Sequence, residues 1–430
     1  MLGRGKGRTA AILIVLAFVV FSIVGPYTVN QEKIKNWDNE TYWSINPRGV
    51  PPDWYGWIMN LPPTEWLKGD FENGSYVFTY DFHYSASPQE ILILSNSTSS
   101  LRVDIIGPDG RRYTVWNGPV YGIARPSRLP QTFSRIAKEK CGITVSEGDI
   151  LFRNAYNIIF SKPNGDCYDH PDFLKGTYRI TVSGNPPLTK RDGVRIRVIG
   201  RTYGNLGTDT LGRDVWAGFA WGARDTIATA ILGAAILTML GLFLGAGSAM
   251  SGWMGNLADF ISKLVTVTPT LPAAVALVII ASRITPNYTM RISSLNMALI
   301  LGILLMGNTS RNIRSIVEEE LRKEYVESAR ALGGNSLWIL RKHVSRVLLP
   351  YTAYQFSLAV PGMIAFMTLM GFFNVVPGLN WGALMSQTLR TYGKFTMAWW
   401  QVVPVGTAIG LIALGFVWLT KEIEYEFLRK

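Results

Sequence analysis

The chain has 430 residues, of which 48% are hydrophobic and 17% are charged, and its net charge is +12. Soluble proteins usually have about 25% charged residues, so this composition argues against a soluble globular chain. The positive excess is more simply explained by basic cytoplasmic loops of a membrane protein than by nucleic-acid binding.

Long stretches without Asp, Glu, Lys or Arg divide the sequence. A transmembrane helix needs about 20 mostly apolar residues to cross about 30 Å of hydrocarbon. Six stretches meet this requirement, within 9–31, 226–258, 264–282, 292–310, 347–389 and 395–420. We therefore predict a polytopic α-helical membrane protein of the cell membrane, with six transmembrane helices and with both termini in the cytoplasm.

Residues 1–31 contain the first predicted span. Three basic residues precede an apolar run over 10–24, an arrangement shared by cleaved signal peptides and uncleaved anchors. The following Gly25-Pro26-Tyr27 offers no small-x-small cleavage site. We therefore favour an uncleaved helix whose N-terminus is cytoplasmic.

Residues 32–205 differ from the rest, because charged, proline and aromatic residues return there. Alternating polarity, typical of β-strands, occurs within 76–82, 90–94, 101–106, 176–183 and 193–199. Gly107-Pro108-Asp109-Gly110 lies between 101–106 and a further strand-like stretch at 111–115, which predicts a hairpin turn. We predict a mainly-β, sandwich-like domain inserted after the first span.

The predicted topology places this insert outside the cytoplasm, and two kinds of residue agree. The two cysteines, Cys141 and Cys167, both lie there, as an extracytoplasmic disulfide requires, although buried thiols are the alternative. Sequons, which also occur by chance, indicate possible N-glycosylation at Asn39, Asn73, Asn96 and, in a later external loop, Asn287.

The segment Cys167-Tyr-Asp-His-Pro-Asp172 gathers a thiol, an imidazole and two carboxylates, which are metal-ligand types. No second cluster of such residues accompanies it. We therefore favour a surface loop closed by a disulfide, and we predict no metal site.

The second half begins with residues 206–225, for which we predict an amphipathic helix on the outer membrane surface. Asp209 would cap this helix, and Trp216, Phe219 and Ala220 would share one face. The second span, 226–250, contains Gly241 and Gly245 in a small-xxx-small pattern. Such a pattern permits close helix contact, although glycine is also simply tolerated in membrane helices.

The remaining spans form a core over 226–420. Asp259 and Lys263 are expected in a short cytoplasmic turn, and Pro269 and Pro272 are expected to bend the third span. The fourth span covers about 295–308, the fifth begins near 348, and the last covers 399–419. We expect external loops at 283–291 and 372–397, and a cytoplasmic tail at 421–430.

The loop 311–346 between the fourth and fifth spans is strongly basic and therefore cytoplasmic. It is either a topology signal alone or a docking surface for a cytoplasmic partner. The chain has no G-x-x-x-x-G-K-[ST], H-E-x-x-H or G-x-S-x-G motif, so we predict no catalytic residues, no cofactor and no enzyme activity in this chain. The uncharged spans also provide no groups for proton coupling, so a transporter would need an external ATPase.

The loop also carries a family resemblance. Tyr325-Val-Glu-Ser-Ala-Arg-Ala-Leu-Gly333, followed by Arg341-Lys-His343, resembles the EAA loop of binding-protein-dependent ABC importer permeases, in the variant of the C-type subunit of the dipeptide/oligopeptide family. A second signature resembles that subunit at Leu206–Val215 with Gly222-Ala-Arg224, and Pro377–Gly382 resembles a looser third one. The large insert with sequons looks more like archaeal members.

The resemblance implies a type I ABC importer permease fold and a short coupling helix that enters a cleft of the ATPase. The residues it assigns to ATPase coupling are Glu327, Ser328, Ala329, Arg330, Ala331, Leu332, Gly333, Arg341 and His343. Its second signature comprises Gly207, Thr208, Asp209, Leu211, Gly212, Arg213 and Asp214. This chain departs from the family at Ser345-Arg346, where Leu-Pro is usual, so we expect the following helix to run further.

The implied partners are a related second permease, two cytoplasmic ATP-binding subunits that hold ATP and Mg, an extracytoplasmic solute-binding protein and the lipid membrane; no nucleic acid is implied. The implied substrate is a short peptide, with an oligosaccharide as the alternative. A different class of function is a membrane-anchored assembly protein that does not transport, and co-purification of an ATPase would separate the two.

Overall fold

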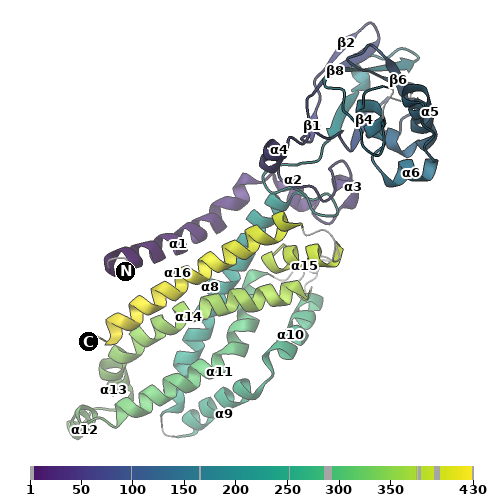
Figure 1. Cartoon of the computed structure of the whole chain (residues 1–430). Coiled ribbons are helices and arrows are strands. Elements are labelled where there is room, and N and C mark those ends of the chain that lie inside the picture. Colours follow the sequence, from purple (N-terminus) through teal and green to yellow (C-terminus); the bar gives the residue numbers. More distant parts are fainter. Residues whose placement is uncertain are drawn as a thin grey trace. The chain divides into compact units, whose positions relative to one another are not determined.

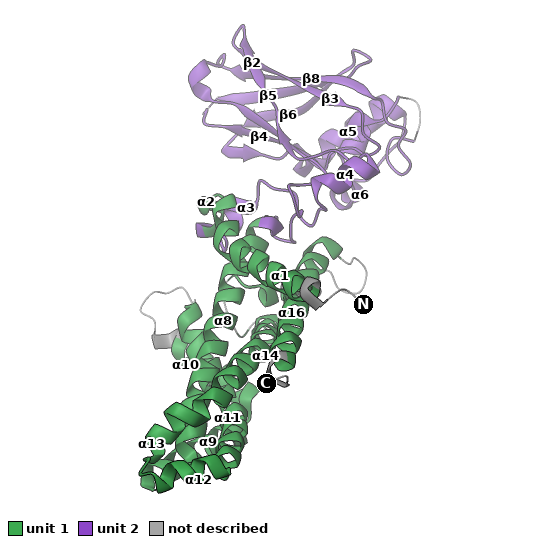
Figure 2. Ribbon diagram, turned by 90° about the vertical axis from the view of Figure 1, so that its left-hand side faces the viewer, with its two compact units in different colours: residues 1–34, 217–430 green, residues 35–216 purple. Residues whose placement is uncertain are grey.

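A computed structural model describes residues 4–97, 99–163, 166–250, 252–284, 293–373, 375, 379–391 and 398–428. The chain divides into two compact units, drawn in different colours in Figure 2. The β unit comprises Lys35–Trp216, and the helical unit comprises Met1–Ile34 and Ala217–Lys430.

Two antiparallel sheets build the β unit. One has the order β1 (Glu65–Trp66), β9 (Arg195–Ile199), β4 (Glu90–Ser95) and β7 (Gly122–Ala124). The other has the order β2 (Gly69–Glu72), β3 (Ser75–Phe82), β8 (Gly176–Asn185), β5 (Ser100–Ile106) and β6 (Arg112–Pro119). The hairpin between β5 and β6 turns at Gly107–Gly110, as predicted, and Gly110 has the positive φ of 76° that favours glycine in such turns.

The alternation that predicted the strands also produces the core. In β3, every second side chain is buried, namely Tyr76, Phe78, Tyr80 and Phe82. Residues of both sheets join one hydrophobic cluster, which a β-sandwich requires.

Several helices in the β unit were not predicted. They are α3 (Glu40–Trp43), α4 (Asp53–Met59), α5 (Pro130–Cys141), α6 (Glu147–Phe152) and α7 (Tyr156–Phe160). Phe133, Ile150 and Phe160 of the last three helices belong to the shared core, so these helices cover it.

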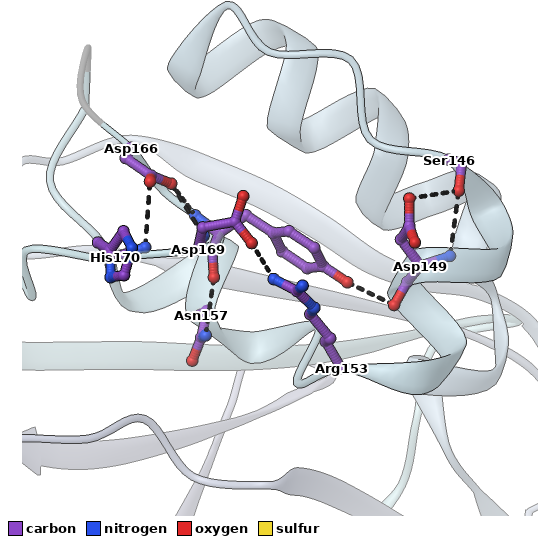
Figure 3. A network of polar contacts seen from close by, with 8 residues as sticks. Ser146, Asp149, Arg153, Asn157, Asp166, Asp169 and His170 are labelled. Carbon is purple, nitrogen blue, oxygen red and sulfur yellow. Dashed lines mark hydrogen bonds and ion pairs between the residues drawn. The ribbon is translucent and has the colours of Figure 1, made fainter.

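A disulfide joins Cys141 at the end of α5 to Cys167, as predicted. Figure 3 shows the polar contacts beside it, where Asp166 accepts hydrogen bonds from the backbone amides of Asp169 and His170. Asp169 also forms an ion pair with Arg153. Among the described residues no group of three His, Cys, Asp or Glu side chains is placed to hold a metal ion.

The predicted glycosylation sites are partly described. Asn39, Asn73 and Asn96 are exposed, and the side chain of Asn39 caps α3 by accepting from the amides of Thr41 and Tyr42. Asn287 lies outside the described residues. Modification of these sites stays a prediction.

The helical unit is built of α-helices (Figure 1). They include α1 (Arg4–Val24), α8 (Val215–Ser248, whose first two residues belong to the β unit), α9 (Trp253–Val267), α10 (Thr270–Ile284), α11 (Ser294–Leu321), α14 (Ser345–Phe372), α15 (Trp381–Thr391) and α16 (Trp399–Leu428). Short segments η1 (Gly25–Thr28) and α2 (Gln31–Lys35) follow α1. In α8, Gly241 and Gly245 face α11, where an added Cβ would lie 2.9 Å from Thr309 and 2.5 Å from Ser310, so the glycines do allow close helix contact.

Within the described residues, four helices are long and apolar enough to span a membrane, or five if the bent pair α9 and α10 is one span. The pair bends by 96° beside Pro269 and Pro272, the two prolines expected to bend the third span. The fourth predicted span lies in α11, which does not pass the same test of length and hydropathy. The exact number of six spans is therefore a prediction still.

Two predicted boundaries are wrong. Residues 206–225 do not form a separate helix, because α8 begins at Val215 and continues without a break to Ser248. Asp259 and Lys263 lie inside α9 rather than in a turn. They form an (i,i+4) ion pair on the helix surface. The tail 421–430 continues α16 as far as Leu428.

The predicted loop 372–397 also contains regular structure. Helix α15 occupies Trp381–Thr391, and the side chain of Asn380 caps it by accepting from the amide of Ala383 at 2.9 Å. The described part of this segment is therefore largely helical, and its external position stays a prediction.

Candidate functional site

The basic loop folds into two short helices at the end of the helical unit remote from α15 (Figure 1). Helix α11 ends at Leu321, α12 comprises Glu324–Ala331, and α13 comprises Ser336–Ile339. A π-turn, η4 (Leu340–Val344), then joins α13 to α14. Glu324 and Glu327 in the first turn and Arg330 in the last turn of α12 complement its dipole.

The C-terminus of α12 is fixed by glycine. Gly333 has a φ of 89°, its amide donates to the carbonyl of Arg330 at 2.9 Å, and the amide of Gly334 donates to that of Ala329 at 3.0 Å. This pair of hydrogen bonds around a left-handed glycine is a Schellman motif. It defines where α12 stops and where the chain turns toward α13.

The inner side of α12 is anchored in the helical unit. Val326 and Ala329 are buried in a cluster with Ile313 and Val317 of α11 and Leu348 of α14. The cluster therefore brings residues of α11, α12 and α14 together.

The outer side of α12 is open. Glu327, Ser328, Arg330 and Ala331 are exposed, and Leu332 has 89% of its surface exposed. A groove of about 530 Å³ lies beside them, lined by Tyr325, Ser328, Leu332, Gly333, Trp338 and His343, among others. Exposed apolar side chains that gather beside a groove, here Tyr325, Leu332 and Trp338, are typical of a surface that binds another protein.

Two of the predicted coupling residues differ from the others. Ala329 is buried in the inner cluster, although it also lines the groove, and Arg341 lines a different, apolar hollow that also includes Phe243 and Leu348. His343 lines the groove, where its ring lies 5.7 Å from that of Tyr325 and 5.3 Å from that of Trp338. The other predicted residues lie together on or beside the outer face.

Sequence reasoning missed Trp338. Its ring also lies 4.8 Å from the ammonium of Lys342, and it remains partly exposed at the edge of the groove. The signal was available, because an aromatic residue is unusual in the strongly charged loop 311–346.

Polar contacts hold the start of α12. Glu320 of α11 is buried, accepts a hydrogen bond from Tyr325 at 2.5 Å, and forms an ion pair with Lys323. Burial alone would raise the pKa of Glu320, but the hydrogen bonds from Lys323 and Tyr325 hold it below its ordinary value. The carboxylate is therefore ionised at neutral pH and fixes the bend between α11 and α12.

The second signature lies in the β unit and forms a tight buried loop. Asp209 accepts from the amide of Arg213 at 2.8 Å and from its guanidinium at 2.7 Å, and both side chains are buried. The guanidinium also lies 4.7 Å from the ring of Trp37. Asp214, not Asp209, caps α8, by accepting from the amide of Trp216 at 3.0 Å.

This loop is hydrogen-bonded to a segment near the beginning of the β unit. We define the clasp as residues 46–50 and 207–214. It is closed by hydrogen bonds from Asn46 to Gly212, from Gly49 to Asp209 and between Val50 and Thr208, at 2.8–3.2 Å. Gly207 and Gly212 have positive φ, and Gly212 is further constrained because a Cβ would lie 2.9 Å from the carbonyl of Trp43. Leu211 is half-buried in the same loop.

The third signature lies between helices of the helical unit. Trp381 is fully buried, its indole donates to the carbonyl of Phe219 at 3.0 Å, and the two rings stack. Gly382 lies against α14, where a Cβ would be 2.3 Å from the carbonyl of Thr368. Pro377 and Gly378 lie outside the described residues.

Comparison with known proteins agrees with the resemblance of the loop. Residues 223–424 match the family described as "binding-protein-dependent transport system inner membrane component", and this match lies entirely in the helical unit. The helical unit therefore contains the whole region that is similar to this family.

Curated relatives point to peptide transport. The probable D,D-dipeptide transport system permease protein of Escherichia coli K12 is 28% identical over 215 residues, covering 49% of this chain and 68% of that protein. A peptide transport system permease protein of E. coli O6:H1 is 29% identical over 213 residues, with the same coverage. The oligopeptide transport system permease protein of Haemophilus influenzae is 28% identical over 188 residues, covering 43% and 58%.

Among solved structures, an inward-facing methionine ABC transporter is similar, with 17% identity, a TM-score of 0.36, and coverage of 48% of this chain and 96% of that chain. The family match and the curated relatives confirm the predicted resemblance to permeases of peptide ABC importers. Together with the long apolar helices, this match indicates a multi-pass membrane protein.

Proposed function

We propose that this chain, whose residues 223–424 are a permease component of a binding-protein-dependent transport system, is one of two permease subunits of an ATP-driven importer of short peptides. It would form half of the translocation pathway, and a related permease would form the other half. The names of the curated relatives, which include a dipeptide and an oligopeptide permease, support the peptide class.

The observation that carries the proposal is the geometry of α12. The helix has a solvent-facing outer side and an inner side packed against α11 and α14. A cytoplasmic ATPase that holds the outer side would therefore move both long helices when it closes around ATP. Rigid-body rocking of packed helices is a common way to alternate between two facings.

The topology that this function requires uses α11 as a sixth span, in addition to α1, α8, the bent pair α9 and α10, α14 and α16. The residues 295–310 of α11 contain no charge, so they can cross the hydrocarbon. Both termini and α12 would then be cytoplasmic, and the β unit would be external. In that position the β unit would dock a solute-binding protein or brace the partner permease.

Co-purification with reconstituted uptake tests this function. The chain is co-expressed with the ATPase and permease subunits encoded beside it, purified in detergent and reconstituted with the solute-binding protein. We expect the ATPase to co-purify and labelled peptide to accumulate only with ATP. If no ATPase co-purifies and no ATP-dependent uptake occurs, the alternative of a membrane-anchored assembly protein replaces this proposal.

A further inference from the structure

The β unit contains a cavity of about 720 Å³ that the transport role does not use. It lies between the segment 44–48, the start of β4, and the residues that follow β7, all of which belong to the β unit. Its volume falls within the range of about 300–1,000 Å³ that small-molecule sites occupy.

Positive charge dominates this cavity. Arg48, Arg125 and Arg128 line it, and Glu90 is the one carboxylate among its described lining residues. Burial lowers the pKa of Arg125, and the carboxylate of Glu90 offsets this effect. The charges of Arg128 and Arg48 lower the pKa of Arg125 further, so both guanidinium groups are close enough to repel that of Arg125. Bringing them together is unfavourable unless an anion joins them.

Glu90 cannot neutralise the three arginines. Its side chain is buried, and its two oxygens already accept hydrogen bonds from the hydroxyl of Ser127 and from the amide of Ile91. Burial raises the pKa of Glu90, and its hydrogen bonds and the charge of Arg125 oppose this effect. Within the part of the chain that the structure describes, neither Arg48 nor Arg128 has a carboxylate within ion-pair distance.

One arginine is held in place for binding. Arg125 is half-buried and donates one guanidinium nitrogen to the carbonyl of Ser44, which fixes the orientation of the group. A guanidinium held in this way can offer its remaining N–H groups to a carboxylate in a bidentate arrangement.

Part of the remaining lining is apolar, beside the polar side chains of Ser44, Asn46, Gln89 and Ser127. Trp116, Ile123 and Leu129 border the same cavity, and Ile123 and Leu129 are exposed. A ligand that satisfies both parts of the lining needs an anionic group and an adjacent apolar group.

We infer that this cavity binds an organic carboxylate with an apolar body, of which the C-terminal residue of a short hydrophobic peptide is the example. The carboxylate pairs with Arg125 and Arg128, and the apolar side chain lies against Trp116. The choice of a peptide over other organic acids rests on the proposed import of peptides; the carboxylate site itself does not.

The experiment measures binding of Ala-Ala-Phe to the full-length protein in lipid nanodiscs by calorimetry. We expect the free acid to bind and the C-terminal amide to bind at least about tenfold more weakly, because the amide loses charge-assisted hydrogen bonds to arginine. Arg128→Gln should weaken binding of the acid by a similar factor. Arg112→Gln, an exposed arginine outside the cavity, is the matched control and should change nothing.

Two further probes separate the outcomes. Hydrocinnamate binding without peptide binding supports the carboxylate site and overturns only the peptide assignment. Equal binding of acid and amide, equal loss in Arg128→Gln and Arg112→Gln, or binding of inorganic phosphate alone overturns the inference. Because nanodisc binding requires neither ATP nor the ATPase, a negative result here leaves the import function to its own test.

Discussion

At the scale of single residues, Gly333 combines an unusual backbone conformation with a place in the proposed coupling segment. Its φ of 89° is one that other L-residues adopt at a cost of about 1–2 kcal/mol. An added Cβ would meet nothing within 4 Å, so a substitution is penalised through the backbone rather than through a clash. The identity of the substituted residue therefore matters more than its volume.

We predict that Gly333→Val impairs ATP-dependent uptake more than Gly333→Asn does. Asparagine tolerates the left-handed region, whereas a β-branched side chain does not. Uptake by the reconstituted importer is the measurement, and Ala331→Val, at an exposed helical position two residues earlier, is the matched control for added volume. Equal impairment by the Val and Asn variants would mean that the left-handed turn is not required.

Lys140 is a second informative residue, in the core of the β unit. Its side chain is 2% exposed and donates to the carbonyl of Ile159 at 2.7 Å. Burial lowers the pKa of this amine to about 8. Asp109 raises this pKa and Arg111 lowers it, both by smaller amounts. The unfolded chain, with a pKa of about 10.4, therefore binds more protons than the folded chain between these two pH values.

We predict that the free energy of unfolding of the β unit rises with pH from 8 to 10.4 through Lys140, because stability increases with pH where the unfolded state binds more protons. Hydrogen exchange of β3 and β8 across this range measures the slope. Lys140→Met should reduce the slope, whereas Lys138→Met, an exposed lysine on the same helix, should leave it unchanged. A slope that both variants share would assign it to other groups.

At the scale of elements, residues 207–214 lie in a stretch that we predicted to be helical, but they form a loop of the clasp instead. The helical spacing of Trp216, Phe219 and Ala220 is present, but it belongs to the first turns of α8, which starts at Val215. Two glycines with positive φ and the buried pair of Asp209 and Arg213 instead hold 207–214 as a loop. A helical pattern cannot reveal an ion pair that closes a loop against a distant segment.

We predict that Asp209→Asn destabilises the β unit by about 3–5 kcal/mol, because it leaves the guanidinium of Arg213 buried without a partner. Arg213→Met should cost less, since Asp209 keeps hydrogen bonds from two backbone amides. Denaturant unfolding measured through the β unit tests the order. As a control, Lys162→Met removes an exposed ion pair and should change stability by less than about 1 kcal/mol.

The difference between local sequence patterns and contacts with distant segments explains which other elements were predictable. Strands such as β3, with one buried and one exposed face, and the hairpin at Gly107–Gly110 follow from local pattern. Helices α5 and α15 do not, because their burial depends on distant partners, such as the stacking of Trp381 on Phe219. In the loop, the motif located α12 and Gly333, but only the fold could show that Ala329 is buried and that Arg341 lines a different hollow.

At the scale of the whole molecule, the β unit is an insertion that the chain enters and leaves at one place. The amide of Asp53 donates to the carbonyl of Gly204 at 2.9 Å, and that of Tyr203 donates to Pro51 at 3.0 Å. The two chain segments are therefore adjacent between the sandwich and the clasp. A deletion can close the chain there and keep the clasp.

We predict that a chain lacking residues 54–203, joined by a short Gly-Ser linker, still assembles with the ATPase but loses uptake that depends on the solute-binding protein. Co-purification and uptake are measured on the same preparation. Loss of assembly together with uptake would indicate a bracing role. Unchanged uptake and assembly would exclude both docking and bracing by the β unit.

The central claim is that α12 contacts a cytoplasmic ATPase, and site-specific cross-linking tests it most directly. Both native cysteines are joined in a disulfide, so Leu332→Cys introduces a single free thiol on the exposed end of α12. With a photoactivatable probe on this thiol, we predict a cross-link to the ATPase whose yield changes when ATP is added. Tyr121→Cys, at an exposed position in the β unit, is the control and should give no such product. A cross-link at Tyr121→Cys but none at Leu332→Cys, in a preparation that contains the ATPase, would contradict the account.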